Sequence, residues 1–369
     1  MKRTDVLIVG GGPAGAVLGN LLKEKGVDYL IIERFSHNRN KICAGGLPVG
    51  IESILPASLK SFKRVEYDKI TISYRNVLSA SSTVKRVFMY GVMRREFDEF
   101  LRSGLNVNYN ETFREFEMHK DSVVVKTNKN TYRTKFLVGA DGVGSRVSLL
   151  SGLAPKKRFI VAEEKEIPFK RYESNREVKI FFGYNFLGYG WIFPKEKVLS
   201  AGAGSLQKHF KVGASNKFSE KAKLYVYPIS IWGGEEDLAN GRVALIGEAG
   251  NLVDPFSAAG IFHAVFSARL LSEALLENLK LGKSDLYSYN ELLKKHFYSE
   301  LSYALFLSKV FYPFLPAIKK YIIRESTLNL AVDLASKGYI SYGEFYNRLK
   351  NSKHLSLHLA YFIIKKFVK

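Results

Sequence analysis

The sequence predicts an α/β fold in which a parallel, helix-covered sheet is interrupted by a mainly antiparallel sheet and followed by a helical C-terminal region. Three observations predict it. Residues 1–33 read as a strand, a glycine turn, a helix and a second strand. A short, fully apolar strand at 243–246 leads into a long helical pattern at about 260–281. Between them lie segments rich in Phe and Tyr that alternate with a period of two, as antiparallel strands do.

The first glycine motif explains why the N-terminal unit is expected to be Rossmann-like. In the segment Asp5–Gly15, Gly10 allows a tight turn, Gly12 lets the backbone approach a diphosphate, and Gly15 lets helix and strand pack closely. Free N–H groups at the helix start face the anion. Glu33 follows Gly15 by eighteen residues, where a carboxylate accepts hydrogen bonds from a ribose and repels a 2′-phosphate. The unit therefore predicts FAD or NAD rather than NADP.

Composition limits the class of protein. The chain has 369 residues, of which 46% are apolar, enough for a sizeable core. Its formal charge of +21 favours an anionic partner, which can be nucleic acid, a membrane surface or a phosphorylated substrate. The single cysteine, Cys43, excludes an internal disulfide and suits a reducing cytoplasm. Met1-Lys2-Arg3 leads directly into a strand, so no secretory signal is expected, and no apolar run is expected to reach the roughly 18 to 20 residues of a membrane span.

The remaining elements follow in order. Residues 65–93 contain alternating strands, 94–103 form a helix, and 123–125 and 136–138 are further strands. From about 159 to 226 the pattern is mostly strand, and after 281 it is helical, with a break expected at Pro313 and Pro316. We therefore expect three parts: a discontinuous cofactor domain (1–65, 90–155 and 240–290), a β-sheet substrate domain (66–89 and 156–239) and a helical region (291–369).

Two later segments resemble known fingerprints. Phe136–Arg146 is a strand that ends in an Asp-Gly turn, and Val243–Gly260 is a buried strand followed by glycine turns. With the first motif and the helix start Arg94–Asp98, they resemble the fingerprints of flavoproteins of the p-hydroxybenzoate hydroxylase type. The resemblance implies FAD rather than NAD, although this class usually carries Asp where Glu248 stands. The implied cofactor-binding residues are Gly10, Gly12, Pro13, Ala14, Gly15, Glu33, Arg34, Cys43, Ala44, Gly45, Arg94, Asp141, Gly142, Gly247, Glu248, Gly260 and Ile261.

The segment Tyr189–Lys195, with Gly202 seven residues on, narrows the chemistry. It resembles the Tyr-x-Trp-x-Phe-Pro-Lys…Gly signature of the geranylgeranyl reductase family, whose members saturate isoprenoid double bonds. The resemblance implies hydride transfer from reduced flavin together with delivery of a proton. A period of two places alternate aromatic rings on one strand face, where they can wall an apolar tunnel for a prenyl chain. The predicted substrate-binding residues are Tyr189, Trp191, Phe193, Gly46 and Phe182.

The loop Lys41–Gly46 resembles the cysteine-glycine loop that this family places beside the isoalloxazine ring. Cys43, Tyr189 and Trp191 are therefore the predicted catalytic residues, and Lys41 is the expected basic neighbour of the thiol. The proton donor stays open. Cys43, His263, the tyrosines near Trp191 and a water at the flavin are the candidates.

The electron donor and the partners follow from less specific signals. No second glycine fingerprint for NAD(P)H is present, so the donor is expected to be a transient NAD(P)H or reduced ferredoxin. The predicted partners are a polyprenyl lipid and an anionic membrane surface, with no nucleic acid and no metal. Leu355–Lys369 reads as an amphipathic helix that can lie on such a membrane or dock on the domain. A cytoplasmic protein peripherally associated with the membrane is expected.

Two other functions are compatible with the same motifs. A flavin-dependent monooxygenase or halogenase would share the fold, but the segment Tyr189–Pro194 departs from the halogenase Trp-x-Trp-x-Ile-Pro pattern at its first and fifth positions. A flavin electron carrier without a substrate of its own is the other alternative. A closed surface over the flavin, with no apolar tunnel, would favour the carrier.

Overall fold

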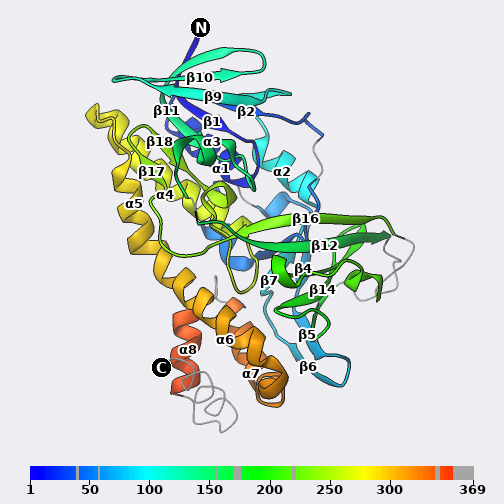
Figure 1. The fold of residues 1–369 in the computed structure, drawn as a ribbon. Helices are drawn as coiled ribbons and strands as arrows, with labels where there is room; N and C mark the ends of the chain where they lie inside the picture. Colours follow the sequence, from blue (N-terminus) through cyan, green and yellow to red (C-terminus); the bar gives the residue numbers. More distant parts are fainter. Residues whose placement is uncertain are drawn as a thin grey trace.

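The structure is a computed structural model that describes residues 1–38, 41–56, 59–154, 156–168, 176–217, 222–336 and 341–351. An eight-stranded sheet lies at the top of Figure 1, a seven-stranded sheet below it, and the C-terminal helices at the bottom. The predicted fold class, an α/β flavoprotein-type domain with an inserted antiparallel sheet and C-terminal helices, is confirmed.

The eight-stranded sheet contains the first glycine motif. Its order is β17-β18-β11-β1-β2-β8, and β10 and β9 extend it from β11 as antiparallel strands. Val6, Leu7 and Ile8 of the central strand are fully buried, as expected for a parallel strand covered on both faces. The strands are β1 (Lys2–Val9), β2 (Tyr29–Glu33), β8 (Val107–Tyr109), β9 (Phe113–Met118), β10 (Val123–Thr127), β11 (Thr131–Gly139), β17 (Ala239–Asn240) and β18 (Val243–Leu245).

Helices cover this sheet and place their N-termini at the ends of its strands. α1 (Pro13–Glu24) follows β1, and α4 (Ile261–Leu281) packs against α1. Both helices therefore start at the carboxyl edge of the parallel strands, where ligands bind in open α/β sheets. The other helices of this part are α2 (Arg94–Arg102), α3 (Arg146–Ser151) and α5 (Tyr287–Leu293).

The seven-stranded sheet has the order β16-β12-β15-β14-β13-β5-β6. Every neighbouring pair in it is antiparallel except β13 and β5, which are parallel. The strands are β5 (Lys69–Tyr74), β6 (Leu78–Thr83), β12 (Arg158–Pro168), β13 (Glu177–Phe182), β14 (Gly188–Pro194), β15 (Val198–Leu206) and β16 (Leu224–Ile231). A third, small sheet has the order β3-β7-β4. Its strands are β3 (Gly46–Pro48), β4 (Val65–Tyr67) and β7 (Met89–Gly91), which lie in the chain between strands of the two larger sheets.

The C-terminal part is helical: α6 (Ser299–Ile322), α7 (Glu325–Ser336) and α8 (Tyr342–Lys350), with a π-helical turn at Lys294–Tyr298 between α5 and α6. The expected break at Pro313 and Pro316 is wrong, because α6 continues through both prolines. A proline costs about 3 kcal/mol inside a helix, whereas each large buried side chain contributes roughly 1.5–3 kcal/mol. Packing outweighs propensity here because α6 buries Leu301, Leu307, Val310, Leu315 and Ile318.

One helical stretch among the described residues, Tyr287–Ile322, has the length and composition of a membrane span. The expectation of no such segment is therefore wrong. A search for uncharged runs misses it because one side chain, Lys309, interrupts residues 301–318. In its most apolar 18-residue stretch, 39% is buried inside the protein, and core helices of globular proteins can be equally long and apolar.

Candidate active site

A cavity of about 820 Å³ lies where the two large sheets and the C-terminal helices meet. Its walls have two chemically different parts. The cofactor part comprises the glycine turns and helix starts of the parallel sheet. The sheet part is one face of the seven-stranded sheet, faced by side chains of α6, α7 and α8. The loop Cys43–Gly46 lines the cavity as well.

The cofactor part is shaped by positions where only glycine fits. Gly10 has φ +107°, and a Cβ there would lie 2.4 Å from the Ala140 carbonyl oxygen. A Cβ on Gly15 would lie 2.0 Å from the Gly10 carbonyl oxygen, so this glycine lets α1 approach the turn. α1 starts at Pro13 after Gly12 without a side-chain cap, and both residues line the cavity. Its uncapped N–H groups suit a diphosphate.

Glu33 ends β2 at the cavity wall and is only 2% exposed. Its Oε2 accepts a hydrogen bond from the Gly11 N–H at 2.8 Å, and its Oε1 accepts one from the Phe35 N–H at 3.0 Å. These bonds fix the carboxylate beside the glycine turn. Each oxygen has a second lone pair, so the predicted acceptance of a ribose hydroxyl is compatible with this geometry.

The guanidinium of Arg94 interacts with the side chain of Cys43. Arg94 is buried at the start of α2, and its guanidinium donates to the two Asp98 carboxylate oxygens at 3.1 and 3.2 Å. Burial lowers the pKa of Arg94, but Asp98 and Cys43 together outweigh burial and raise it. Lys41, the expected neighbour of the thiol, instead donates to Glu248 Oε2 at 3.1 Å. The expectation for Lys41 is therefore corrected: Arg94, not Lys41, is the cation coupled to Cys43.

The second helix start at the cavity belongs to α4. Gly260 precedes it without a side-chain cap, and Gly260 and Ile261 line the cavity. The preceding loop is held by the buried Asp254, whose Oδ1 accepts the N–H groups of Phe256 and Ser257 at 2.7 and 2.9 Å. The positive end of the α4 dipole therefore faces the cavity, where it stabilises negative charge.

His263 does not line the cavity. It is buried on α4 with Nδ1 2.9 Å from the Ala259 carbonyl oxygen. Burial lowers the pKa of His263 more than the nearby Asp254 raises it, which favours the neutral ring. This placement removes His263 from the candidate proton donors.

The sheet part follows the predicted period of two. Tyr189, Trp191 and Phe193 of β14 line the cavity, and residues from neighbouring strands extend the same wall. Gly202 of β15 pairs with Trp191, and a Cβ there would lie 2.2 Å from Trp191 Cζ2. The glycine lets the indole lie across β15. The additional wall residues are Ile70, Ile72, Ile160, Ala162, Ile180, Phe182, Tyr227, Ile229 and Ile231.

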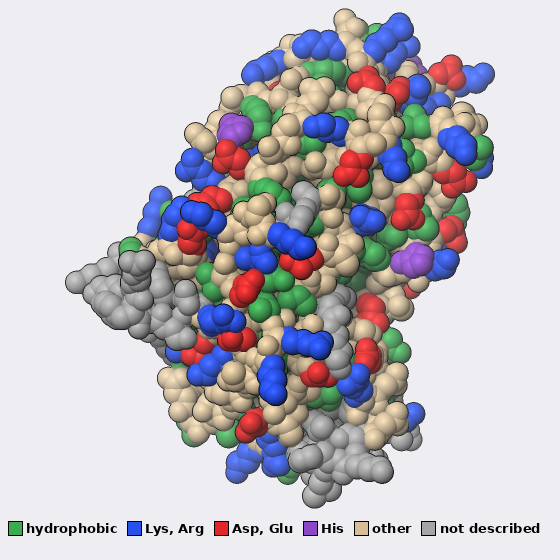
Figure 2. Space-filling view, turned by 180° about the vertical axis from the view of Figure 1, so that it is seen from behind, with side chains coloured by type: hydrophobic (Ala, Val, Ile, Leu, Met, Phe, Trp, Pro, Cys, Tyr) green, Lys and Arg blue, Asp and Glu red, His purple; other side chains and the backbone are tan. Residues whose placement is uncertain are grey.

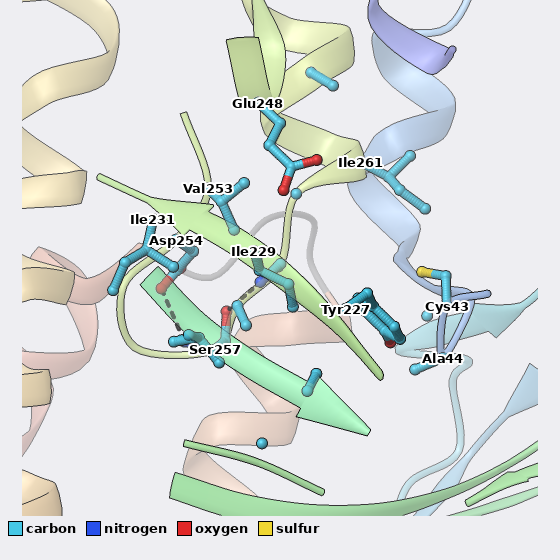
Figure 3. A pocket seen from close by; sticks show the side chains of 18 of the residues that line it. Cys43, Ala44, Tyr227, Ile229, Ile231, Glu248, Val253, Asp254, Ser257 and Ile261 are labelled. Carbon is cyan, nitrogen blue, oxygen red and sulfur yellow. Dashed lines mark hydrogen bonds between the residues drawn. The ribbon is translucent and has the colours of Figure 1, made fainter. Parts of the chain in front are cut away.

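The cysteine loop packs tightly on this wall. A Cβ on Gly46 would lie 2.9 Å from Phe193 Cε1. Gly45 has φ +74°, and a Cβ there would lie 2.2 Å from the Val92 carbonyl oxygen. Figure 3 shows Cys43 and Ala44 beside Tyr227, and the charge of Cys43 contributes to the raised pKa of Tyr227 after burial and Glu164. The loop thus connects the cofactor part to the sheet part.

A buried polar cluster lies beside the apolar wall, on the same face of β12 as Ala162. Lys195 Nζ donates to the Cys43 carbonyl oxygen at 2.7 Å and to Glu166 Oε1 at 3.2 Å, and it lies 3.6 Å from Glu164 Oε1. The Tyr227 hydroxyl donates to Glu164 Oε2 at 2.8 Å. Ser200 Oγ donates to Glu164 Oε1 at 2.6 Å.

Glu164, Glu166 and Tyr227 were not predicted from the sequence. A signal was present, because a period of two along β12 puts Glu164 and Glu166 on the same face as Ala162, which lines the cavity.

The cavity brings together almost all of the predicted site residues. The exceptions are Gly15 and Gly247, which do not line it. A Cβ on Gly247 would lie 3.0 Å from Ala14 Cβ and 3.2 Å from Ala264 Cβ, so this glycine supports the packing of α1 on α4. The segment Leu355–Lys369 lies outside the described residues.

Comparison with known proteins agrees with this site. A family model described as an FAD binding domain matches residues 3–51. The chloroplastic geranylgeranyl diphosphate reductase of Nicotiana tabacum is 29% identical over 365 residues, covering 87% of this chain and 77% of the relative. A digeranylgeranylglycerophospholipid reductase of Methanosphaera stadtmanae is 25% identical over 333 residues, covering 80% and 84%.

A solved structure shares the whole fold. A geranylgeranyl bacteriochlorophyll reductase-like protein from Thermoplasma acidophilum superposes with a TM-score of 0.78 at 20% identity, covering 98% of this chain and 100% of that chain. The resemblance to the geranylgeranyl reductase family, predicted from residues 189–202, is confirmed. The chain is an FAD-dependent oxidoreductase.

Proposed function

We propose that this protein saturates isolated double bonds of geranylgeranyl chains, carried by precursors of membrane ether phospholipids. One observation carries the proposal: a single cavity joins the cofactor part to an apolar wall built by Tyr189, Trp191 and Phe193. A flavin held in the first part would face a prenyl chain lying on the second. The names of the two relatives support this class of substrate.

The cofactor part fits FAD on its own geometry. Two uncapped helix starts, at Pro13 and Ile261, offer backbone N–H groups to anionic groups. Glu33 at the cavity wall would accept hydrogen bonds from a ribose, and Arg94 would provide a buried cation beside the cysteine loop. When bound and reduced, FAD supplies a hydride to one carbon of the double bond.

The sheet part would bind the prenyl chain and exclude water from it. Its isoleucine and aromatic side chains exclude water and extend a flexible chain against the wall. An isolated trisubstituted alkene is electron-rich and does not accept hydride readily, so a proton has to reach its second carbon. The protein must therefore hold that proton close to an apolar surface.

The substrate chain would come from a membrane, and features of α6 support its contact with one. Lys309 and Pro313 of α6 line the cavity. Three aromatic side chains of α6 are partly exposed: Tyr303 by 44%, and Phe314 and Tyr321 by 37% each. Their spacings of eleven and seven residues are close to three and two helical turns, so they lie on the same face of the helix. Lysines and arginines are spread over the face shown in Figure 2, among fewer acidic side chains. We propose peripheral binding to an anionic bilayer on the cytoplasmic side.

The electron donor is proposed to be a transient NAD(P)H or a reduced ferredoxin. The formal charge of +21 suits an acidic ferredoxin. Anaerobic bleaching of the flavin with NADH, NADPH and reduced ferredoxin in parallel identifies the donor. A flavin that none of the three reduces contradicts this part of the proposal.

The test of the function is a single turnover without oxygen. Reduced holoenzyme is mixed with digeranylgeranyl glycerophospholipid in vesicles, and the fully saturated lipid serves as the matched control. The flavin should reoxidise only with the unsaturated lipid, which should gain two hydrogens per double bond by mass spectrometry. Unchanged lipid across several geranylgeranyl substrates, or product that forms only with oxygen, would count against a reductase.

A further inference from the structure

The reduction consumes one proton per double bond, yet the wall that holds the alkene is apolar. The inference below rests on the proposed function. We infer that Tyr227 donates this proton, and that Glu164, Lys195 and Glu166 form a polar path that connects Tyr227 to the protein surface.

Two hydrogen bonds and one ion pair connect the groups of this path. Tyr227 lines the cavity, and its hydroxyl is 2.8 Å from Glu164 Oε2. Glu164 Oε1 is 3.6 Å from Lys195 Nζ, which is 3.2 Å from Glu166 Oε1. The side chains of Glu164 and Lys195 are 0% and 1% exposed, whereas that of Glu166 is 22% exposed. One end of the path therefore meets the substrate space and the other meets water.

Three other tyrosines at the cavity have different partners. Tyr342 donates to the carboxyl group of Asp254 at 2.5 Å, but Asp254 is only 1% exposed, whereas the path from Tyr227 ends at Glu166, which is 22% exposed.

Tyr189 and Tyr312 donate to backbone groups. The Tyr189 hydroxyl donates to the Ser257 carbonyl oxygen at 2.5 Å, and the Tyr312 hydroxyl donates to the Phe256 carbonyl oxygen at 2.6 Å. A backbone carbonyl accepts a hydrogen bond but cannot return a proton. Tyr227 donates to a carboxyl group, which can.

The charges around Glu164 suit a group that holds and releases a proton. Burial is the largest effect and raises the pKa of Glu164, as does the neighbouring Glu166. Lys195 and the hydroxyls of Ser200 and Tyr227 lower it by less, so the pKa stays above its ordinary value. Burial, followed by Glu164, raises the pKa of Tyr227, which keeps the phenol protonated until substrate takes its proton.

The step balances with the hydride. Tyr227 first turns its O–H from Glu164 Oε2 toward the alkene, and the protonated Glu164 then donates to Tyr227 Oη. The Tyr227 O–H bond breaks, and a C–H bond forms from the π pair at the carbon that does not receive hydride. The proton on Glu164 then moves to Tyr227 Oη. Glu164 regains a proton from water through Lys195 and Glu166. Tyr227 is the catalytic residue of this inference, and the other three position and resupply its proton.

Trp191 and Lys195, both in the segment Tyr189–Lys195, are connected to Glu164 of this path. Trp191 Nε1 donates to Ser200 Oγ at 3.2 Å, and Ser200 donates to Glu164. Lys195 holds both Glu166 and the carbonyl group of Cys43. Hydrogen bonds and the ion pair between Lys195 and Glu164 thus connect the aromatic wall, the cysteine loop and Glu164.

The test uses FAD-loaded protein with two variants and two matched controls. Tyr227→Phe removes one hydroxyl, and Glu164→Gln keeps the shape of the side chain without a titrating proton. Tyr298→Phe removes a buried hydroxyl outside the cavity walls. Glu163→Gln alters a buried carboxyl of the same strand that accepts the N–H of Gly213 at 2.7 Å instead of facing Tyr227.

Lipid reduction in a single turnover should slow by roughly 10²–10⁴-fold in Tyr227→Phe and Glu164→Gln, the usual size of a general-acid effect. Lipid binding to the oxidised protein should stay within about two-fold, so the loss falls on kcat rather than KM. Both controls should retain parental rates. A Tyr227→Phe variant that reduces lipid at the parental rate overturns the inference.

A second measurement needs no substrate and separates this inference from the proposed function. Infrared titration of ¹³C-glutamate-labelled protein should show a carboxyl that titrates above ordinary glutamates in the parent and in Glu163→Gln. The signal should be absent from Glu164→Gln and shifted in Tyr227→Phe. If the parent reduces no prenyl lipid, the proposed function fails, but the titration still shows whether Glu164 has a raised pKa and contacts Tyr227. Coincident spectra of parent and Glu164→Gln overturn the path itself.

Discussion

The two parts of the cavity are built in different ways. The cofactor part presents mainly backbone: glycines at strained or crowded positions, and helix starts whose N–H groups lack side-chain caps. The sheet part presents side chains from alternate positions of paired strands. The first part recognises charge through local geometry, and the second recognises shape through the register of distant segments. Substitutions should therefore affect one part without affecting the other.

The largest expected effect is on the cofactor part. Gly15→Ala places a Cβ 2.0 Å from the Gly10 carbonyl oxygen and forces the turn open. FAD binding, measured by flavin fluorescence, should weaken by at least about 100-fold, or about 2.7 kcal/mol. Gly19→Ala is the matched control in the same helix, because its Cβ meets side-chain atoms of Ile31 and Tyr29 that can move. Equal FAD affinity in both variants would contradict the assigned role of Gly15.

The next effect concerns the sheet part alone. Gly202→Ala places a Cβ 2.2 Å from Trp191 Cζ2, whereas Gly204→Ala on the same strand meets its nearest atom at an ordinary 3.4 Å. We expect Gly202→Ala to lose about 1–3 kcal/mol of unfolding free energy in urea, and to bind lipid more weakly while keeping FAD. Gly204→Ala should keep its stability. If the two variants unfold alike, the close packing of Trp191 on Gly202 is wrong.

The difference between local geometry and strand register also explains which site residues could be predicted from the sequence. The glycine turns were predictable because each depends on residues within one βαβ unit. The face shared by Tyr189, Trp191 and Phe193 was predictable because it needs only the strand period. Tyr227 was not, because its contact with Glu164 requires the register that pairs β16 with β12, which places Tyr227 opposite Ala162.

Two sequence-based errors have the same origin. Lys41 is close to Cys43 in the chain, yet its ammonium pairs with Glu248, which is 207 residues away. The prolines of α6 satisfy the local rule for a helix break, but packing against the core keeps the helix continuous. Local sequence therefore predicted elements well and long-range partners poorly.

A smaller effect is expected on membrane binding, through which the lipid would reach the sheet part. Lys309→Glu and Lys320→Glu on α6 should each weaken binding to anionic vesicles, since a basic side chain near such a surface contributes about 1 kcal/mol, roughly five-fold in affinity. Vesicle co-sedimentation at low and high salt measures it. Lys25→Glu, at the C-terminal end of α1, makes the same charge change away from α6. An equal loss in all three variants would indicate an effect of net charge and contradict docking by α6.

The smallest effect is the pH dependence contributed by Glu164. Its pKa is raised in the folded protein, first by burial, while Lys195 opposes this. A raised carboxyl pKa contributes stability that is complete below the ordinary value of 4.5 and is lost as the pH rises through the folded value. Urea unfolding should therefore show the parent losing stability relative to Glu164→Gln over that rise. A difference that stays constant with pH would contradict the raised pKa.

In the proposed function, one cavity holds a flavin in its cofactor part and a prenyl chain on its sheet part. A crystal structure of the FAD-bound protein with a geranylgeranyl lipid tests it most directly. We expect the chain to lie along Tyr189, Trp191 and Phe193, with one double bond between the flavin ring and the Tyr227 hydroxyl. A chain bound elsewhere, or a double bond out of reach of the flavin, would contradict it.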